Sequence, residues 1–163
     1  MADKTKTNAM RKLDSMKIPY KEHFYADTGA ISGTEVAAVL SEDPDKVFKT
    51  LVTTGKSGTH YVFMIPVNCE LDLKKAASAA GEKNIEMLKA KDLLPLTGYV
   101  HGGCSPIGMK KFFTTVIDIS ASEKEKIVFS AGKIGRHIEM APSELLKAID
   151  FKFADITMEG TKR

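Results

Sequence analysis

Residues 47–67 read VFKTLVTTGKSGTHYVFMIPV. Two runs rich in β-branched and aromatic residues, 47–54 and 60–67, flank the segment GKSG, which holds two glycines. Such runs favour β-strands, and glycines between them favour a tight connection. The stretch therefore predicts a β-hairpin.

Segments on both sides of this hairpin carry helical and strand patterns. Helical spacing and helix-end residues predict helices at 5–16 with Thr5 or Thr7 as cap, at 34–40 opened by Thr34, at 71–81 ended by Gly81, and at 141–149 with Pro142 in the first turn. Strand patterns occur at 18–25, 112–118, 126–132 and 153–157.

The strands outnumber the helices, and hairpins alternate with crossover connections. This order predicts an α+β domain with a mixed, curved, barrel-like β-sheet surrounded by helices. The chain has 163 residues, which favours a single domain over 1–163. No GxGxxG or Walker-type loop opens a helix, which disfavours a nucleotide-binding parallel sheet.

Composition indicates a protein of the cytoplasm. The N-terminal segment MADKTKTNAMRK is polar, unlike a signal peptide, and the longest apolar run, 61–67, is too short to cross a membrane. Cys69 and Cys104 belong to no CxxC pair and are expected to be reduced thiols. The net charge of +3 is too small for a protein that coats duplex nucleic acid. It fits a protein that grips one end of a nucleic acid, and equally one that binds none.

A glycine-rich segment, YVHGGCSPIGMKK, occupies residues 99–111. Gly102 and Gly103 offer bare backbone amides, Pro106 stiffens the turn, and Gly108 permits a dihedral angle or a close approach that a side chain would block. Such amides can point at a carbonyl or phosphate oxygen. The alternative is a turn between two strands that is rich in turn-forming residues.

Lys49 interrupts the first strand of the hairpin. By alternation it shares a face with Val47 and Leu51, while Phe48, Thr50 and Val52 share the other. A lysine in an apolar strand either lines a cavity or extends its amine to solvent at an edge. Lys110 and Lys111, which leave the glycine-rich segment, could collect phosphates.

The remaining chemistry-bearing residues form no known motif. The four histidines make neither HxxxH nor HExxH, and His101 with Cys104 has a metal-like spacing without a third ligand, so neither metal nor cofactor is expected. Ser105 lies in no GxSxG elbow. Cys104 is a nucleophile only if a histidine lies beside it in space; otherwise it is a small residue that lines a pocket.

Taken together, several separated motifs resemble the YbaK/EbsC family of small aminoacyl-tRNA deacylases, which are relatives of the editing domain of bacterial prolyl-tRNA synthetases. The GxxxPxG motif of that family corresponds to Gly102, Pro106 and Gly108, and its strand lysine to Lys49. The segments that carry the resemblance are TNAMRKLDSMKIPY (7–20), PDKVFKTLV (44–52), ELDLKKAA (70–77), LTGYVHGGCSPIGMKK (96–111), FSAGKIG (129–135) and KFADIT (152–157).

The resemblance implies an enzyme that removes cysteine from mischarged Cys-tRNA(Pro). It implies that Lys49 contacts the 3′-terminal adenosine or its phosphate, and that Gly102 and Gly103 accept the ester carbonyl. The cysteine thiol of the substrate would attack its own ester. Residues expected to bind substrate by this resemblance are Tyr25, Thr50, Cys104, Ser105, Pro106, Gly108, Ser130 and His137.

Partners follow from the same resemblance. The expected partners are the acceptor end of tRNA(Pro) and prolyl-tRNA synthetase, with neither membrane nor DNA. Some relatives carry an aspartate at the position of His137 and an aromatic residue at that of Ser32, which leaves the preferred amino acid open. Removal of alanine from Ala-tRNA(Pro), or a non-catalytic module that binds tRNA or protein, are the alternatives.

Overall fold

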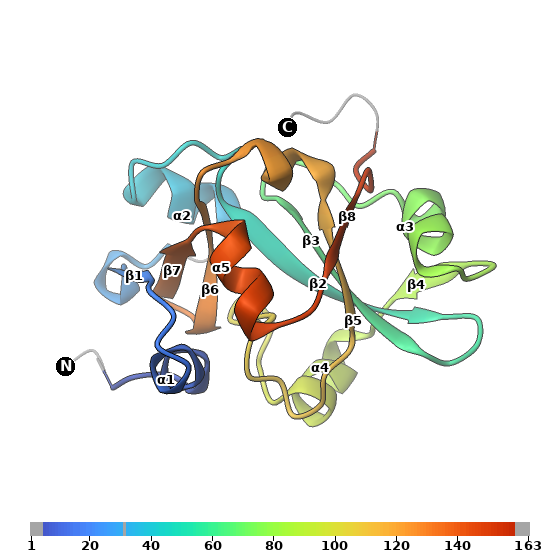
Figure 1. The fold of residues 1–163 in the computed structure, drawn as a ribbon, viewed down its shortest axis with the longest axis horizontal. Helices are drawn as coiled ribbons and strands as arrows, with labels where there is room; N and C mark the ends of the chain where they lie inside the picture. Colours follow the sequence, from blue (N-terminus) through green and yellow to red (C-terminus); the bar gives the residue numbers. More distant parts are fainter. Residues whose placement is uncertain (1–4, 31, 159–163) are drawn as a thin grey trace.

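The computed structural model describes residues 5–30 and 32–158. Helices and strands follow one another as the α+β prediction expects (Figure 1). In chain order they are α1 (Asn8–Ser15), β1 (Lys21–Phe24), η1 (Ala26–Thr28), α2 (Gly33–Val39), β2 (Phe48–Gly55), β3 (His60–Pro66), α3 (Leu73–Ala80), β4 (Ile85–Met87), α4 (Ala90–Thr97), β5 (Thr114–Asp118), η2 (Ile119–Glu123), β6 (Ile127–Lys133), β7 (Arg136–Met140), α5 (Pro142–Ala148) and β8 (Lys152–Ala154).

The predicted hairpin is confirmed as β2 and β3. The two strands pair antiparallel from Phe48 opposite Pro66 to Thr54 opposite His60. Gly58 takes a φ of 89°, and its amide donates to the carbonyl of Gly55 at 2.9 Å. The glycine therefore provides the left-handed residue that closes the turn.

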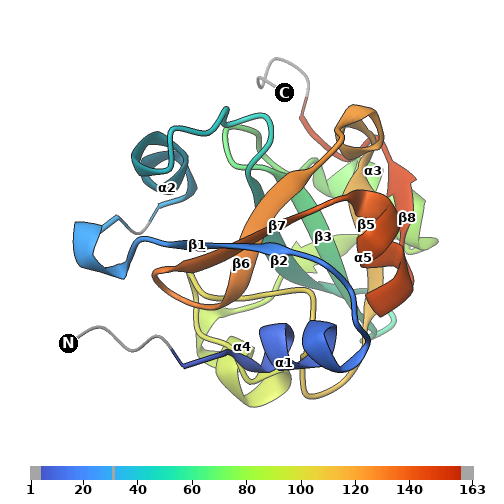
Figure 2. The same cartoon turned by 60° about the vertical axis from the view of Figure 1, so that its left-hand side comes forward.

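The strands form two sheets that meet along β2. Five strands run in the order β4-β2-β3-β5-β8, with β3, β5 and β8 parallel, and three run in the order β1-β7-β6. A bridge between Val47 and Val128 joins the sheets. In Figure 2, β1, β6 and β7 cross in front of β2 and β3. The predicted mixed sheet is thus divided in two.

The long apolar run of β3 is explained by burial on both faces. Phe63 and Ile65 pack with Ala76 and Ala77 of α3 on one face. Met64 packs in the main core, which also holds Leu13 of α1. A strand covered on both faces needs no polar alternation, which is why residues 61–67 read as continuous apolar sequence.

Several predicted boundaries are wrong, such as the start of β1, which is Lys21 rather than residue 18. Helix α2 is capped by Ser32 rather than Thr34, because the Ser32 hydroxyl accepts from the Glu35 amide while the Glu35 carboxylate accepts from the Ser32 amide. The last strand, β8, ends at Ala154, earlier than the predicted 157. The residues beyond it bond instead to the chain at 70–72, where the Asp72 amide donates to the Ile156 carbonyl at 2.8 Å.

Candidate functional site

A cavity of about 540 Å³, called here the large cavity, lies beside β2. Its walls come from the start of α2, the segment that leads into α4, residues 101–104, and the paired strands β6 and β7. Aliphatic side chains of Val36, Leu88 and Leu93 contribute to these walls. The cavity is therefore assembled from parts of the chain that lie far apart in sequence.

The large cavity occupies an opening along one edge of β2. On that side, the Val128 amide donates to the Lys46 carbonyl and the Leu88 amide donates to the Val52 carbonyl, each at 3.0 Å. Strand β4 pairs only with residues 53–55. Backbone groups of alternate residues point to the same side of a strand. The amide and carbonyl of Thr50 therefore face the opening, midway between these two contacts.

Thr50 and Lys49 both bring unmet polar groups to this opening. The Thr50 hydroxyl is the one buried side-chain oxygen or nitrogen without a hydrogen bond among the residues that the structure describes. Lys49 makes no side-chain hydrogen bond or ion pair within the same described part of the chain. Burial lowers the pKa of the Lys49 amine, an effect partly opposed by the charge of Glu70. Buried polar groups are normally satisfied, so this pair marks a place for a polar ligand.

The glycine loop, residues 102–108, forms a wall of the large cavity through Gly102 and Cys104. The Gly103 amide instead donates to the Val100 carbonyl at 3.0 Å. The prediction that this amide is bare is wrong, because the turn that precedes it already uses it. A Cβ at Gly103 would lie 3.0 Å from the Ile134 nitrogen, so glycine here permits close packing on the β6–β7 turn.

Cys104 lines the large cavity as a neutral thiol. Burial raises its pKa to about 12, so the thiol stays protonated at neutral pH. The thiolate is the nucleophilic form of cysteine. His101 is exposed, although it also borders the cavity. Of the two alternatives for Cys104, the structure favours the lining residue over the nucleophile.

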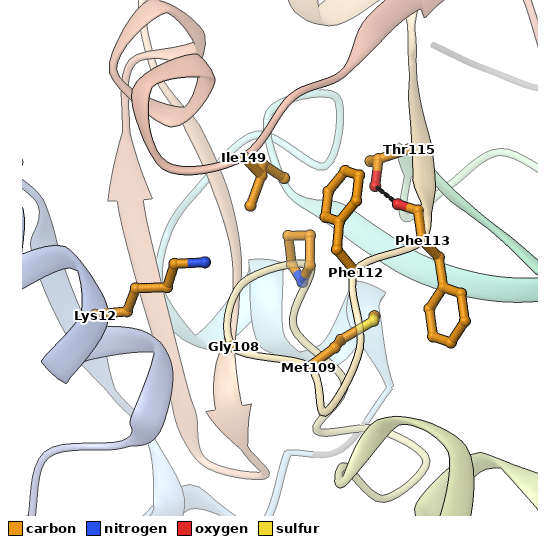
Figure 3. A pocket seen from close by; sticks show the side chains of 8 residues that line it. Lys12, Gly108, Met109, Phe112, Phe113, Thr115 and Ile149 are labelled. Carbon is orange, nitrogen blue, oxygen red and sulfur yellow. Dashed lines mark hydrogen bonds between the residues drawn. The ribbon is translucent and has the colours of Figure 1, made fainter.

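The second half of the glycine loop faces away from the large cavity. Pro106 and Gly108 instead line a smaller cavity of about 140 Å³ (Figure 3). The Ser105 hydroxyl accepts from the Ile107 amide at 3.3 Å and so stabilises the turn. The structure thus separates these three predicted substrate-binding residues from the large cavity.

Tyr99 fixes the glycine loop, a role that the sequence did not indicate. Its hydroxyl donates to the Ile107 carbonyl at 2.5 Å. Gly108 has a φ of 80°, and a Cβ there would lie 2.8 Å from the Tyr99 hydroxyl, which confirms that a side chain would be blocked at Gly108. Gly132 on β6 approaches the Tyr99 ring equally closely. Tyr99 therefore joins the loop to β6.

His137 and Ser130 form the wall opposite β2. They face each other across β6 and β7, and both line the large cavity. Burial lowers the His137 pKa to about 4, so the ring is neutral at pH 7. The Tyr25 hydroxyl lies 3.0 Å from His137 Nδ1. Tyr25 is buried and contacts His137, but it does not itself line the large cavity, where it was expected.

A charged cluster lies beside this wall, outside the large cavity. Ligand atoms of His23, Glu42 and Glu139 lie within 4.8 Å of one another. The Lys46 amine already contacts Glu139 at 2.7 Å and Glu42 at 3.4 Å. The Lys46 side chain therefore neutralises part of the negative charge of Glu42 and Glu139. These contacts connect the chain after α2 to β7.

The α+β fold belongs to a known class of protein. Residues 29–148 match the family described as aminoacyl-tRNA editing domain, and the chain belongs to this family. It is 48% identical over 153 residues to EbsC of Enterococcus faecalis, named for Cys-tRNA(Pro)/Cys-tRNA(Cys) deacylase activity, with 93% of each chain covered.

Two further comparisons agree with this assignment. A proline–tRNA ligase of Pelobacter propionicus is 27% identical over 103 residues, which cover 63% of this chain and 18% of the ligase. The crystal structure of a protein described as a trans-editing enzyme for prolyl tRNA synthetase superposes with a TM-score of 0.85 at 20% identity, covering 97% of this chain and 99% of that one. At that identity the superposition shows the shared fold. Within the described residues, the helices are too short or too polar to cross a bilayer.

Proposed function

We propose that this protein is a trans-editing deacylase that removes cysteine from mischarged Cys-tRNA(Pro), with the cysteine thiol of the substrate as the nucleophile. One observation carries the proposal: Lys49 and Thr50 bring unpartnered polar groups to the open edge of β2, in a cavity whose own thiol is protonated. Family membership and the identity with EbsC support the reaction class.

Lys49 is suited to hold the 3′ end of the tRNA. The terminal nucleotide carries a phosphate, and an ammonium group without an internal partner can pair with it. Burial lowers the pKa of the Lys49 amine, because the charged form is poorly solvated there. Contact with the phosphate would offset this desolvation cost. The cation would thereby place the aminoacyl ester beside Thr50.

Thr50 and Gly102 are suited to orient the ester. The Thr50 hydroxyl and amide lie at the opening, and Gly102 borders the same space. Donors fixed in a dry cavity stabilise an oxyanion more strongly than water does, because they need no reorganisation during the reaction. We assign contact with the ester carbonyl to Thr50 and Gly102 and not to the Gly103 amide, because that amide already donates to the Val100 carbonyl.

The reaction step then needs no nucleophile from the protein. The substrate sulfur attacks the ester carbonyl carbon and forms a C–S bond, the bond from that carbon to the ribose oxygen breaks, and the thiol proton is transferred to that oxygen. The products are a cysteine thiolactone and free tRNA. Holding the two reacting groups in contact supplies the rate enhancement. The neutral His137 ring and the neutral Cys104 thiol fit such a site.

This chemistry complements the synthetase. A pocket built for proline discriminates weakly against cysteine, because the two side chains are similar in volume. A separate enzyme selects cysteine by its reactivity, since alanine and proline have no side-chain nucleophile. The net charge of +3 suits contact with the acceptor end alone, so we infer that prolyl-tRNA synthetase supplies selection of tRNA(Pro). We infer that the protein acts in the cytoplasm, where tRNA and the synthetase are used.

Deacylation of labelled Cys-tRNA(Pro) and Ala-tRNA(Pro) by the Lys49→Met variant tests the proposal. We expect the rate on Cys-tRNA(Pro) to fall by about 100-fold. The free energy of unfolding should stay unchanged or rise, because the substitution removes the desolvation cost of a buried amine. Lys46→Met is the matched control: Lys46 does not line the large cavity, so this variant should lose stability and keep its rate.

The outcomes separate the candidate functions. Equal rates for wild type and Lys49→Met would contradict the role of Lys49. A preference for Ala-tRNA(Pro) would favour the deacylase for alanine, and tight tRNA binding without turnover would favour a non-catalytic module.

A further inference from the structure

The small cavity of about 140 Å³ borders the second half of the glycine loop, whereas the large cavity borders the first half. Figure 3 shows Phe112 and Met109 on one side of it, with Ile149 above and Lys12 reaching in from α1, while the ring of Phe113 points away. Neither its residues nor its place is used by the proposed deacylation. It is therefore a separate candidate for ligand binding.

The size and lining of the small cavity suit one aromatic ring. Phe112, Ile149 and Pro106 contribute apolar side chains to the lining, beside the polar side chains of Lys12 and Thr115. A volume of this size can hold one benzene ring. The ring of Phe112 is 55% exposed, so an aromatic ligand would also cover apolar surface that water now contacts.

Lys12 gives the small cavity a charge preference. Its ammonium group makes no hydrogen bond or ion pair with any residue in the described ranges. In Figure 3 the side chain extends from α1 with its nitrogen directed toward the cavity. A ligand whose ring fills the cavity and whose carboxylate lies at the rim would meet both features.

We propose that the small cavity binds small aromatic carboxylates, with the ring between Phe112 and Ile149 and the carboxylate on Lys12. The ligand would press on Pro106 and Gly108, which belong to the loop whose other end lines the large cavity. The two cavities thus share the glycine loop as a wall. We therefore expect a ligand in the small cavity to change the environment of the loop residues that line the large cavity.

The experiment titrates the full-length protein with benzoate and follows backbone amide resonances by NMR. We expect saturable shifts at Met109, Phe112 and Ile149, with smaller shifts at Cys104. Benzyl alcohol, which has the ring without the charge, should bind more weakly. Phe112→Ala should weaken both ligands, and it changes an exposed side chain, so the fold is retained.

The charge preference is tested by a matched pair of lysine variants. Lys12→Gln should weaken benzoate by about threefold and leave benzyl alcohol unchanged, as expected for loss of one exposed ion pair. Lys111→Gln removes an exposed neighbouring cation that does not line the cavity and should change neither. Absence of saturation at these amides, or equal weakening by both lysine variants, would overturn the proposal. None of these readouts depends on deacylation.

Discussion

The hydroxyl of Tyr99 donates a 2.5 Å hydrogen bond to the backbone carbonyl of Ile107, in the middle of the glycine loop. Both groups are buried. This contact, made by a residue that precedes the loop, helps to fix the loop between the two cavities. Burial also raises the Tyr99 pKa to about 12, which keeps the hydroxyl proton in place as the donor.

The Tyr99→Phe variant tests this contact. It leaves the Ile107 carbonyl buried without a donor, which costs about 1–3 kcal/mol of unfolding free energy. We expect urea denaturation to show this loss and the rate of deacylation to fall with it, because the loop wall is released. Tyr61→Phe is the control: it removes a hydroxyl that donates to Glu82, away from the large cavity. A deacylation rate unaffected by Tyr99→Phe would contradict the positioning role.

Cys104→Ala distinguishes a lining residue from a nucleophile. Because the thiol is held protonated, we expect the variant to deacylate Cys-tRNA(Pro) within about threefold of the wild-type rate. Its stability should fall by about 1 kcal/mol, the cost of a small buried void. Cys69→Ala, another buried cysteine outside the lining, should behave alike. A deacylation rate several hundredfold lower for Cys104→Ala, with no such fall for Cys69→Ala, would instead indicate that Cys104 is the nucleophile.

Stability should depend on pH through His137. Its pKa is about 4 in the folded protein and ordinarily 6.5, because burial disfavours the charged ring. The unfolded chain therefore takes up the proton first as the pH falls. Stability is fully present above pH 6.5 and is lost toward pH 4, by about 3 kcal/mol in all.

Chemical denaturation between pH 7 and pH 4 measures this loss. We expect His137→Asn to lack this contribution, so its free energy of unfolding should fall less steeply than that of the wild type. Parallel curves for the two proteins would contradict a neutral buried ring.

Local sequence signals predicted much of the secondary structure and singled out Lys49 and the glycine loop, whereas Thr50, Ser130 and His137 were expected in the large cavity only from the family resemblance. The β2–β3 hairpin follows from two apolar runs around Gly55 and Gly58, and α3 ends at Gly81, whose φ is 75°. Lys49 is an unexpected charge in an apolar strand, and this anomaly correctly indicated the part of β2 that borders the large cavity. These signals work because strand and helix ends depend on neighbouring residues.

What the sequence did not indicate depends on contacts between distant segments. The edge of β2 is open beside Thr50 because the Val128 amide bonds to Lys46 and the Leu88 amide bonds to Val52, which leaves the residues between them without a neighbouring strand. No local sequence pattern predicts that gap. The same applies to Tyr99 and to the division of the glycine loop between two cavities. Periodicity predicts which face of an element is buried, and tertiary pairing decides what that face meets.

The central claim is that the substrate thiol performs the chemistry. Single-turnover deacylation of Cys-tRNA(Pro) can be compared with that of S-methylcysteinyl-tRNA(Pro), whose side chain cannot attack the ester. We predict rapid release of the cysteinyl group, as a thiolactone, and release of the methylated group at the uncatalysed rate. Equal enzymatic rates for the two substrates would mean that the protein activates water, and would contradict the account.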